Sequence, residues 1–370
     1  MTPTPLTHVD EDAALGLAGP GGDVFRVPGG TVVVGPLSVV IVADPGDDPD
    51  VSGVWNDREF RLVGPAPAPV ASRLMGPLPF TTAGRPPEPL VHLFVRLDGG
   101  CLHLGLLRAS MCEADGDDVL VHCRFQISPP LSRDVLDRVR PPVAPPPLPG
   151  VDWLGDVRTA PGRALESFLT GWYPVTAPRG AVTDVPGSIP GALADFYRLA
   201  AQRPAVLGRH SRIRPLDELR TDSTADRLVF GVECQGCWDW SIPWEPGATD
   251  TDPIVWFEDS HPVPEQERLS GFLLQFSLAE AALGAVYQAW CDDLPRHLLP
   301  VLESRLVRVP LRPFLSPADA PTDFLVGPGL VAPVSPSGDE GKLDVWVGAQ
   351  HRGALHPLGL LDIPWRRFDG

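Results

Sequence analysis

A run of prolines near the middle of the chain limits what it can fold into. Residues 141–150 read PPVAPPPLPG. Consecutive prolines favour an extended, semi-rigid conformation that cannot lie inside a packed helix or sheet. A chain of 370 residues is long enough for two domains. The sequence therefore predicts a first domain over residues 1–140, a linker at 141–150 and a second domain over 151–370, with a long external loop as the alternative to a linker.

The first domain is predicted to be rich in β-structure. Short apolar runs punctuated by Gly, Pro and acidic turns fill residues 24–62 and return at 90–127, where we expect antiparallel strands. Residues 64–90 are expected to run over the surface, because they are rich in Pro and Ala. Residues 1–22 are expected to be a loose arm with at most one helical turn. A helix over Ser132–Arg140, with Ser132 as its N-cap, would close the domain.

The second domain is predicted to be α+β. Apolar residues at helical spacing predict helices at 163–171, 189–202, 268–285 and 294–303. Apolar runs bounded by turn residues predict strands at 211–214, 253–259, 305–309, 323–331 and 343–349. The third of these helices is the longest, and its apolar pattern allows it to continue through Trp290.

The stretch Leu228–Pro243, LVFGVECQGCWDWSIP, predicts a β-hairpin that turns at Gly236. Residues two apart in a strand point to the same face. Trp238 and Trp240 are therefore expected on one face, and Asp239 on the other. Tryptophan is enriched in interface hot spots, although tryptophans on strands are more often core residues.

If the protein binds a partner, this hairpin is the predicted surface. Its carboxylates would supply charge and its indoles apolar area. The candidate partner-binding residues are Glu233, Gln235, Trp238, Asp239 and Trp240.

The cysteines and histidines predict no metal site and no cofactor. The pair Cys234 and Cys237 has CxxC spacing, but it lies in a hairpin turn and no second CxxC exists, so we interpret it as two small turn residues. A second set falls on two strands that could pair, yet its adjacent members must face opposite sides of a strand. That set is Cys101, His103, His122 and Cys123. All six cysteines are expected to be reduced.

The net charge and the absence of known catalytic motifs limit the classes of function that the sequence suggests. The formal net charge of −17 argues against nucleic-acid binding and suits a basic protein partner. No GxSxG elbow and no Gly-rich phosphate loop before a helix occurs in the sequence, and no residue is assigned a catalytic role. The N-terminus does not resemble a secretory signal, and the longest apolar run is too short to span a bilayer, so we expect a cytoplasmic protein that does not bind membranes.

The order of elements in the second half resembles the SMI1/KNR4 proteins, also called the SUKH superfamily. The resemblance covers about residues 150–370 and rests on element order and scattered apolar positions. The C-terminal WVGAQHRGAL and WRRFDG are similar to the ends of actinobacterial members. Cys234 departs from the pattern, which has a polar residue between Glu233 and Gln235. The matching positions are Pro190, Leu193, Phe196, Tyr197, Val229, Phe230, Glu233, Gln235, Gly236, Trp238, Ile242, Leu269, Phe272 and Leu273.

The resemblance implies a mixed α+β domain with a central antiparallel sheet flanked by helices. It also implies a non-enzymatic function, because bacterial members look like immunity proteins that neutralise toxins, often nucleases, by binding them. Two alternatives stay open: an enzyme whose active site lies between the domains and uses carboxylates, and a scaffold protein without a dedicated ligand. The sequence does not determine the partner or the oligomeric state.

Overall fold

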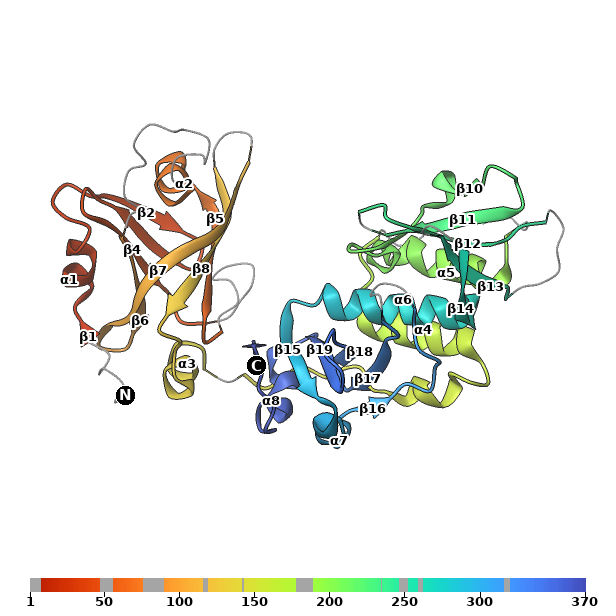
Figure 1. The fold of residues 1–370 in the computed structure, drawn as a ribbon. Coiled ribbons are helices and arrows are strands. Elements are labelled where there is room, and N and C mark those ends of the chain that lie inside the picture. The colour runs from red at the N-terminus through yellow and green to blue at the C-terminus, as the bar shows by residue number, and fades with distance from the viewer. Residues whose placement is uncertain are drawn as a thin grey trace. The chain divides into compact units, whose positions relative to one another are not determined.

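The computed structural model describes residues 8–46, 56–75, 90–115, 119–141, 143–177, 189–233, 235–245, 252–258, 262–315 and 320–370. The chain divides into two compact units, the first ending at Ala144 and the second beginning at Pro145 (Figure 1). This boundary falls inside the proline-rich segment.

The second half of that segment is packed on the second unit. The Gly329 backbone N–H donates to the Pro149 carbonyl at 3.1 Å. Gly329 has a φ of +64°, and a Cβ there would lie 2.8 Å from the Leu148 side chain. Residues 148 and 149 are therefore part of the second unit and not of a free linker.

The first unit contains an eight-stranded sheet among the described residues. The order is β2-β3-β4-β6-β7-β8-β5, with β1 paired to β7. Its end strands β2 and β5 also lie close together, so the sheet curls around an apolar core. The strands are β1 (His8–Val9), β2 (Asp23–Val27), β3 (Gly30–Val34), β4 (Ser38–Ala43), β5 (Glu59–Ala66), β6 (Leu90–Leu97), β7 (Gly100–Ala114) and β8 (Leu120–Ser128).

Two features of the first unit differ from the prediction of antiparallel strands joined by a surface segment. Strands β4 and β6 pair in parallel, so the sheet is mixed and not wholly antiparallel. Parallel neighbours need a long crossover, and β5 with the following helix supplies it. That helix, α2 (Ala68–Met75), buries Val70, Ala71 and Leu74, so these residues do not run over the surface as predicted.

The other helices of the first unit are α1 (Glu11–Gly16) and α3 (Arg133–Val139). Helix α3 confirms the predicted helix and buries Leu136 and Val139 in the core that α2 shares. Helix α1 has six residues and is therefore longer than the single turn expected there. Its Ala14 packs on a separate cluster with Phe94. His8 and Val9 pair with β7 as β1, so this part of the predicted loose arm belongs to the sheet, whereas residues 1–7 lie outside the described residues.

Cys112 and Cys123 form a disulfide, in contrast to the expectation that all the cysteines are reduced. They are register partners on the antiparallel strands β7 and β8, which brings the two sulfur atoms together. Cys101 and Cys291 are free and buried.

The second unit has two sheets among its described residues, and both are antiparallel. The first comprises β9 (Arg212–Ile213), β10 (Arg220–Thr221), β11 (Arg227–Val232), β12 (Asp239–Pro243), β13 (Ile254–Glu258) and β14 (Pro262–Arg268). The second comprises β15 (Tyr287–Pro295), β16 (Val307–Arg308), β17 (Asp323–Gly327), β18 (Leu330–Pro336), β19 (Lys342–Ala349) and β20 (Arg367–Phe368). The helices are α4 (Pro161–Trp172), α5 (Gly191–Gln202), α6 (Leu269–Leu283), α7 (Leu299–Glu303) and α8 (Arg352–Gly359).

Helix α6 is the centre of this unit. Every residue from Leu269 to Ala282 is buried, so other elements cover this helix on every side. Figure 1 shows α6 between the β10–β14 sheet and the β15–β19 sheet, and it also contacts α4 and α5. The unit is therefore α+β as predicted, but two sheets enclose a helix where one central sheet flanked by helices was expected.

Helix α6 ends at Leu283, so the predicted continuation through Trp290 is wrong. Residues 287–295 form β15, in which Tyr287, Ala289 and Cys291 are buried and their neighbours less so, the period of two that belongs to a strand. The predicted helices at α4 and α5 are confirmed, whereas the helix predicted over 294–303 is shorter, because residues 294 and 295 end β15 and α7 spans Leu299–Glu303. Helix α8 and strand β14 were not predicted.

Candidate functional site

The predicted hairpin forms, and its two faces are as expected. Strands β11 and β12 pair antiparallel, with Val232 opposite Asp239 and Leu228 opposite Ile242. Trp238 and Trp240 share a face, with ring centroids 6.5 Å apart. Asp239 points to the opposite face, where it meets two arginines.

The shared tryptophan face is the inner face of the sheet. Trp240 is 1% exposed and its ring centroid lies 5.6 Å from that of Phe272 and 6.0 Å from that of Phe276, both on α6. Trp238 is partly buried against the same core. Trp240 therefore cannot offer the apolar area that the sequence assigned to it, because α6 already covers it.

The two predicted carboxylates are bound within the chain. Asp239 accepts from Arg214 at 2.9 Å and from Arg220 at 3.0 Å. The Glu233 carboxylate accepts from the backbone N–H groups of Gln235 and Cys237, at 2.8 and 3.2 Å, and so closes the hairpin turn. Gln235 is exposed at that turn, whereas Cys234 lies outside the described residues.

The outer face of the sheet carries a different set of side chains. The guanidinium of Arg227, on β11, lies 4.6 Å from the centroid of the Trp256 ring, on β13. A guanidinium over an indole is held by the cation–π attraction. We call the side chains around this pair the outer patch: Arg214, Arg220, Arg227, Asp239 and Trp256.

The outer patch has a rigid base. The strands beneath it press their other face onto α6, where Phe230 and Trp240 each make edge-to-face ring contacts with Phe272. Arg214 is 15% exposed and Arg220 58% exposed, so Asp239 is held between a nearly buried donor and an accessible one. Three arginines and one aspartate make this face arginine-rich within an acidic protein. Successive side chains of the strand sequence IVWFE point to opposite faces, so Trp256 lies on the face opposite the core residue Val255. This alternation is the sequence signal that could have identified Trp256 as an outer residue.

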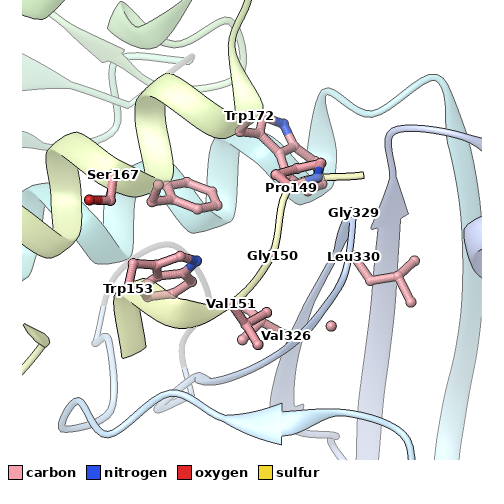
Figure 2. Close-up of a pocket in the computed structure, with 11 residues that line it drawn as sticks. Pro149, Gly150, Val151, Trp153, Ser167, Trp172, Val326, Gly329 and Leu330 are labelled. Atoms are coloured by element: carbon pink, nitrogen blue, oxygen red, sulfur yellow. The ribbon is translucent and has the colours of Figure 1, made fainter. Parts of the chain in front are cut away.

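The pocket in Figure 2 is too small for a ligand. It has a volume of about 20 Å³ and is lined by Pro149, Trp153, Trp172 and Leu330 among others. A site for one water needs about 10–15 Å³ by the same measure. It marks where the proline-rich segment packs on the second unit.

A wider groove of about 780 Å³ runs past Tyr173, Arg209 and Glu280. The buried Glu280 carboxylate accepts the backbone N–H groups of Arg209, His210 and Ser211 at 2.7, 3.0 and 2.7 Å. Burial, together with the negative charge of Glu280, raises the pKa of Tyr173 above its ordinary value. Since three donors already occupy the carboxylate, Glu280 fixes the loop that forms one wall of the groove.

The metal-ligand types considered in the first unit are not brought together. His103 packs on Phe94, with ring centroids 4.6 Å apart, whereas His122 lies 3.4 Å from the Glu113 carboxylate. Within the described ranges, no group of three or more His, Cys, Asp or Glu side chains could hold a metal ion.

No helix in the part of the chain that the structure describes is long and apolar enough to cross a membrane. Comparison with family models, with curated proteins and with solved structures found no match for this chain.

Proposed function

We propose that this protein binds another protein through the outer patch, and that it acts by binding and not by catalysis. The observation that carries the proposal is the Arg227–Trp256 stack on the solvent side of a rigid sheet. Arginine and tryptophan are, with tyrosine, the side chains most enriched among residues that dominate interface energies.

The geometry of the outer patch supports a binding role. A side chain that is already ordered loses little conformational entropy when a partner binds. Arg227 is held by Trp256, and Arg220 by Asp239, while both keep part of their surface accessible. The N–H groups of Arg220 that Asp239 does not occupy suit carbonyl and carboxylate acceptors of a partner.

The net charge of −17 supports a partner that is basic overall, because opposite net charges raise association rates. The resemblance to the SMI1/KNR4 proteins supports a toxin as that partner. In this proposal the acidic protein attracts the toxin, the outer patch fixes the contact, and binding neutralises the toxin.

The test is affinity capture from the native host with full-length protein, followed by mass spectrometry. Wild type and Arg198→Ala, which removes an exposed arginine from α5, should capture the same basic protein. Arg227→Ala and Trp256→Ala should lose most of it. Equal recovery with all four proteins would place the binding site elsewhere. Adding wild-type protein to the captured partner should then abolish the partner's activity.

A further inference from the structure

A third cavity of the second unit lies on the β15–β19 sheet and has apolar walls. It has a volume of about 200 Å³, which exceeds the roughly 10–15 Å³ that one water needs by the same measure. It therefore has room for a side chain. Its apolar walls include Ala279 and Leu283 of α6 and Trp346 of β19.

Trp346 is one half of a stacked pair. Trp290 on β15 is its register partner, and the two rings lie 4.7 Å apart between centroids at an interplanar angle of 16°. Trp346 lines the cavity, so its ring gives the cavity an electron-rich aromatic wall.

Carboxylates supply the charge at this cavity. Asp292 and Asp344 both line it, and Asp292 is paired with Arg366. Asp344 accepts one backbone N–H, from Asp293 at 3.1 Å, which leaves capacity for further donors on a carboxylate. Burial, and then the negative charges of Asp292, Asp344 and Asp293, raise the pKa of the neighbouring Cys291 thiol.

The chain itself shows which cation suits this surface. The Arg367 guanidinium lies 5.2 Å from the centroid of the Trp290 ring, and the adjacent Arg366 pairs with Asp292. Two intramolecular arginines thus already use one indole and one carboxylate of the set. Trp346 and Asp344 offer the same two groups at the cavity.

We propose that this cavity binds an arginine side chain of the partner protein, with the guanidinium against Trp346 and hydrogen-bonded to Asp344. A planar guanidinium can stack on an indole and donate to a carboxylate at once, which an ammonium group does less well. The inference rests on the proposed function in one respect, since it takes the arginine to belong to a bound protein.

The test uses N-acetyl-arginine amide as the probe and N-acetyl-citrulline amide, which has nearly the same shape but no charge, as its control. Full-length protein labelled with 5-fluorotryptophan is titrated by ¹⁹F NMR, and Trp346→Phe assigns the Trp346 resonance. We expect a saturable shift of that resonance with the arginine probe and none with the citrulline probe.

Two variants sharpen the titration. Asp344→Asn keeps an acceptor for the Asp293 N–H and should weaken probe binding about fivefold or more. Asp323→Asn removes a carboxylate of β17 that is paired with Arg308 of β16, and it should leave binding unchanged. An absent Trp346 shift, an equal shift with citrulline, or unchanged affinity in Asp344→Asn would overturn the proposal.

The probe experiment needs no partner, so its outcome is separate from that of the capture experiment. If capture depends on Arg227 and the arginine probe does not bind, the result would support the outer patch and contradict the proposed arginine site in the cavity. Probe binding with capture independent of Arg227 would support the cavity and contradict the outer patch.

Discussion

The Arg227 guanidinium reaches across β12 to lie 4.6 Å from the centroid of the Trp256 ring. Ser241, on the strand between them, is opposite both Val229 and Trp256 in register and is fully buried. The stack therefore contributes to the fold as well as to the proposed binding surface, and the two contributions can be separated by experiment.

Arg227→Ala should lower the free energy of unfolding by about 0.5–1 kcal/mol, the usual size of an accessible cation–π contact. Arg227→Lys should recover part of this loss, because an ammonium group keeps the charge but does not stack as a plane. Urea denaturation of both variants measures the difference. A loss above about 3 kcal/mol for Arg227→Ala would mean that the arginine is chiefly a structural residue.

Glu280→Gln should destabilise the second unit by about 2–3 kcal/mol, since three backbone N–H groups lose a charged acceptor at a buried position. Glu303→Gln is the control, because that carboxylate makes an exposed pair with Arg308. Thermal unfolding of the two variants compares them. Equal stability would show that the Arg209–Ser211 loop does not depend on Glu280.

Gly329→Ala tests whether the proline-rich segment is packed as described. The substitution meets both a left-handed backbone and the Leu148 side chain, so we expect a loss of about 1–2 kcal/mol. Gly338→Ala has open space around it and no positive φ, and should change stability little. A neutral Gly329→Ala would contradict the docking of Leu148.

The histidine pair of the first unit predicts a loss of stability at acid pH. Burial lowers the pKa of both His92 and His103, whose rings lie 5.6 Å apart between centroids. Below the unfolded-state pKa of about 6.5, the unfolded chain then binds more protons than the folded chain, so the free energy of unfolding falls as the pH falls.

Replacing both histidines by phenylalanine should flatten this dependence between about pH 7 and pH 5. His210→Phe, at an exposed position outside the pair, is measured beside it as a matched substitution. Melting temperatures of the three proteins over that pH range decide the matter, and parallel slopes would contradict a role for the pair.

Local patterns in the sequence predicted local structure well. Helices α3, α4 and α5 carry apolar residues at helical spacing, and the hairpin has its turn at Gly236 with its tryptophans on one face. The features that the sequence did not predict depend on contacts between segments that are far apart in the chain. The parallel neighbours β4 and β6, and the enclosure of α6 by two sheets, follow from which segments meet and not from the pattern within any one of them.

The candidate site shows the same limit. A period of two identifies residues that share a face, but it does not say which face the core will cover. Trp240 was assigned to a partner and is covered by α6, whereas Trp256 faces outward. The ion pairs of Asp239 with Arg214 and Arg220 could not be predicted either, because those arginines come from other segments of the chain.

The central claim is that the outer patch binds a protein partner. The most direct measurement is the dissociation constant of the captured partner for full-length wild type, Arg227→Ala and Arg198→Ala by isothermal titration calorimetry. A hot-spot arginine predicts at least about a tenfold weaker complex for Arg227→Ala, with Arg198→Ala close to wild type. Equal dissociation constants for the three proteins would contradict the claim.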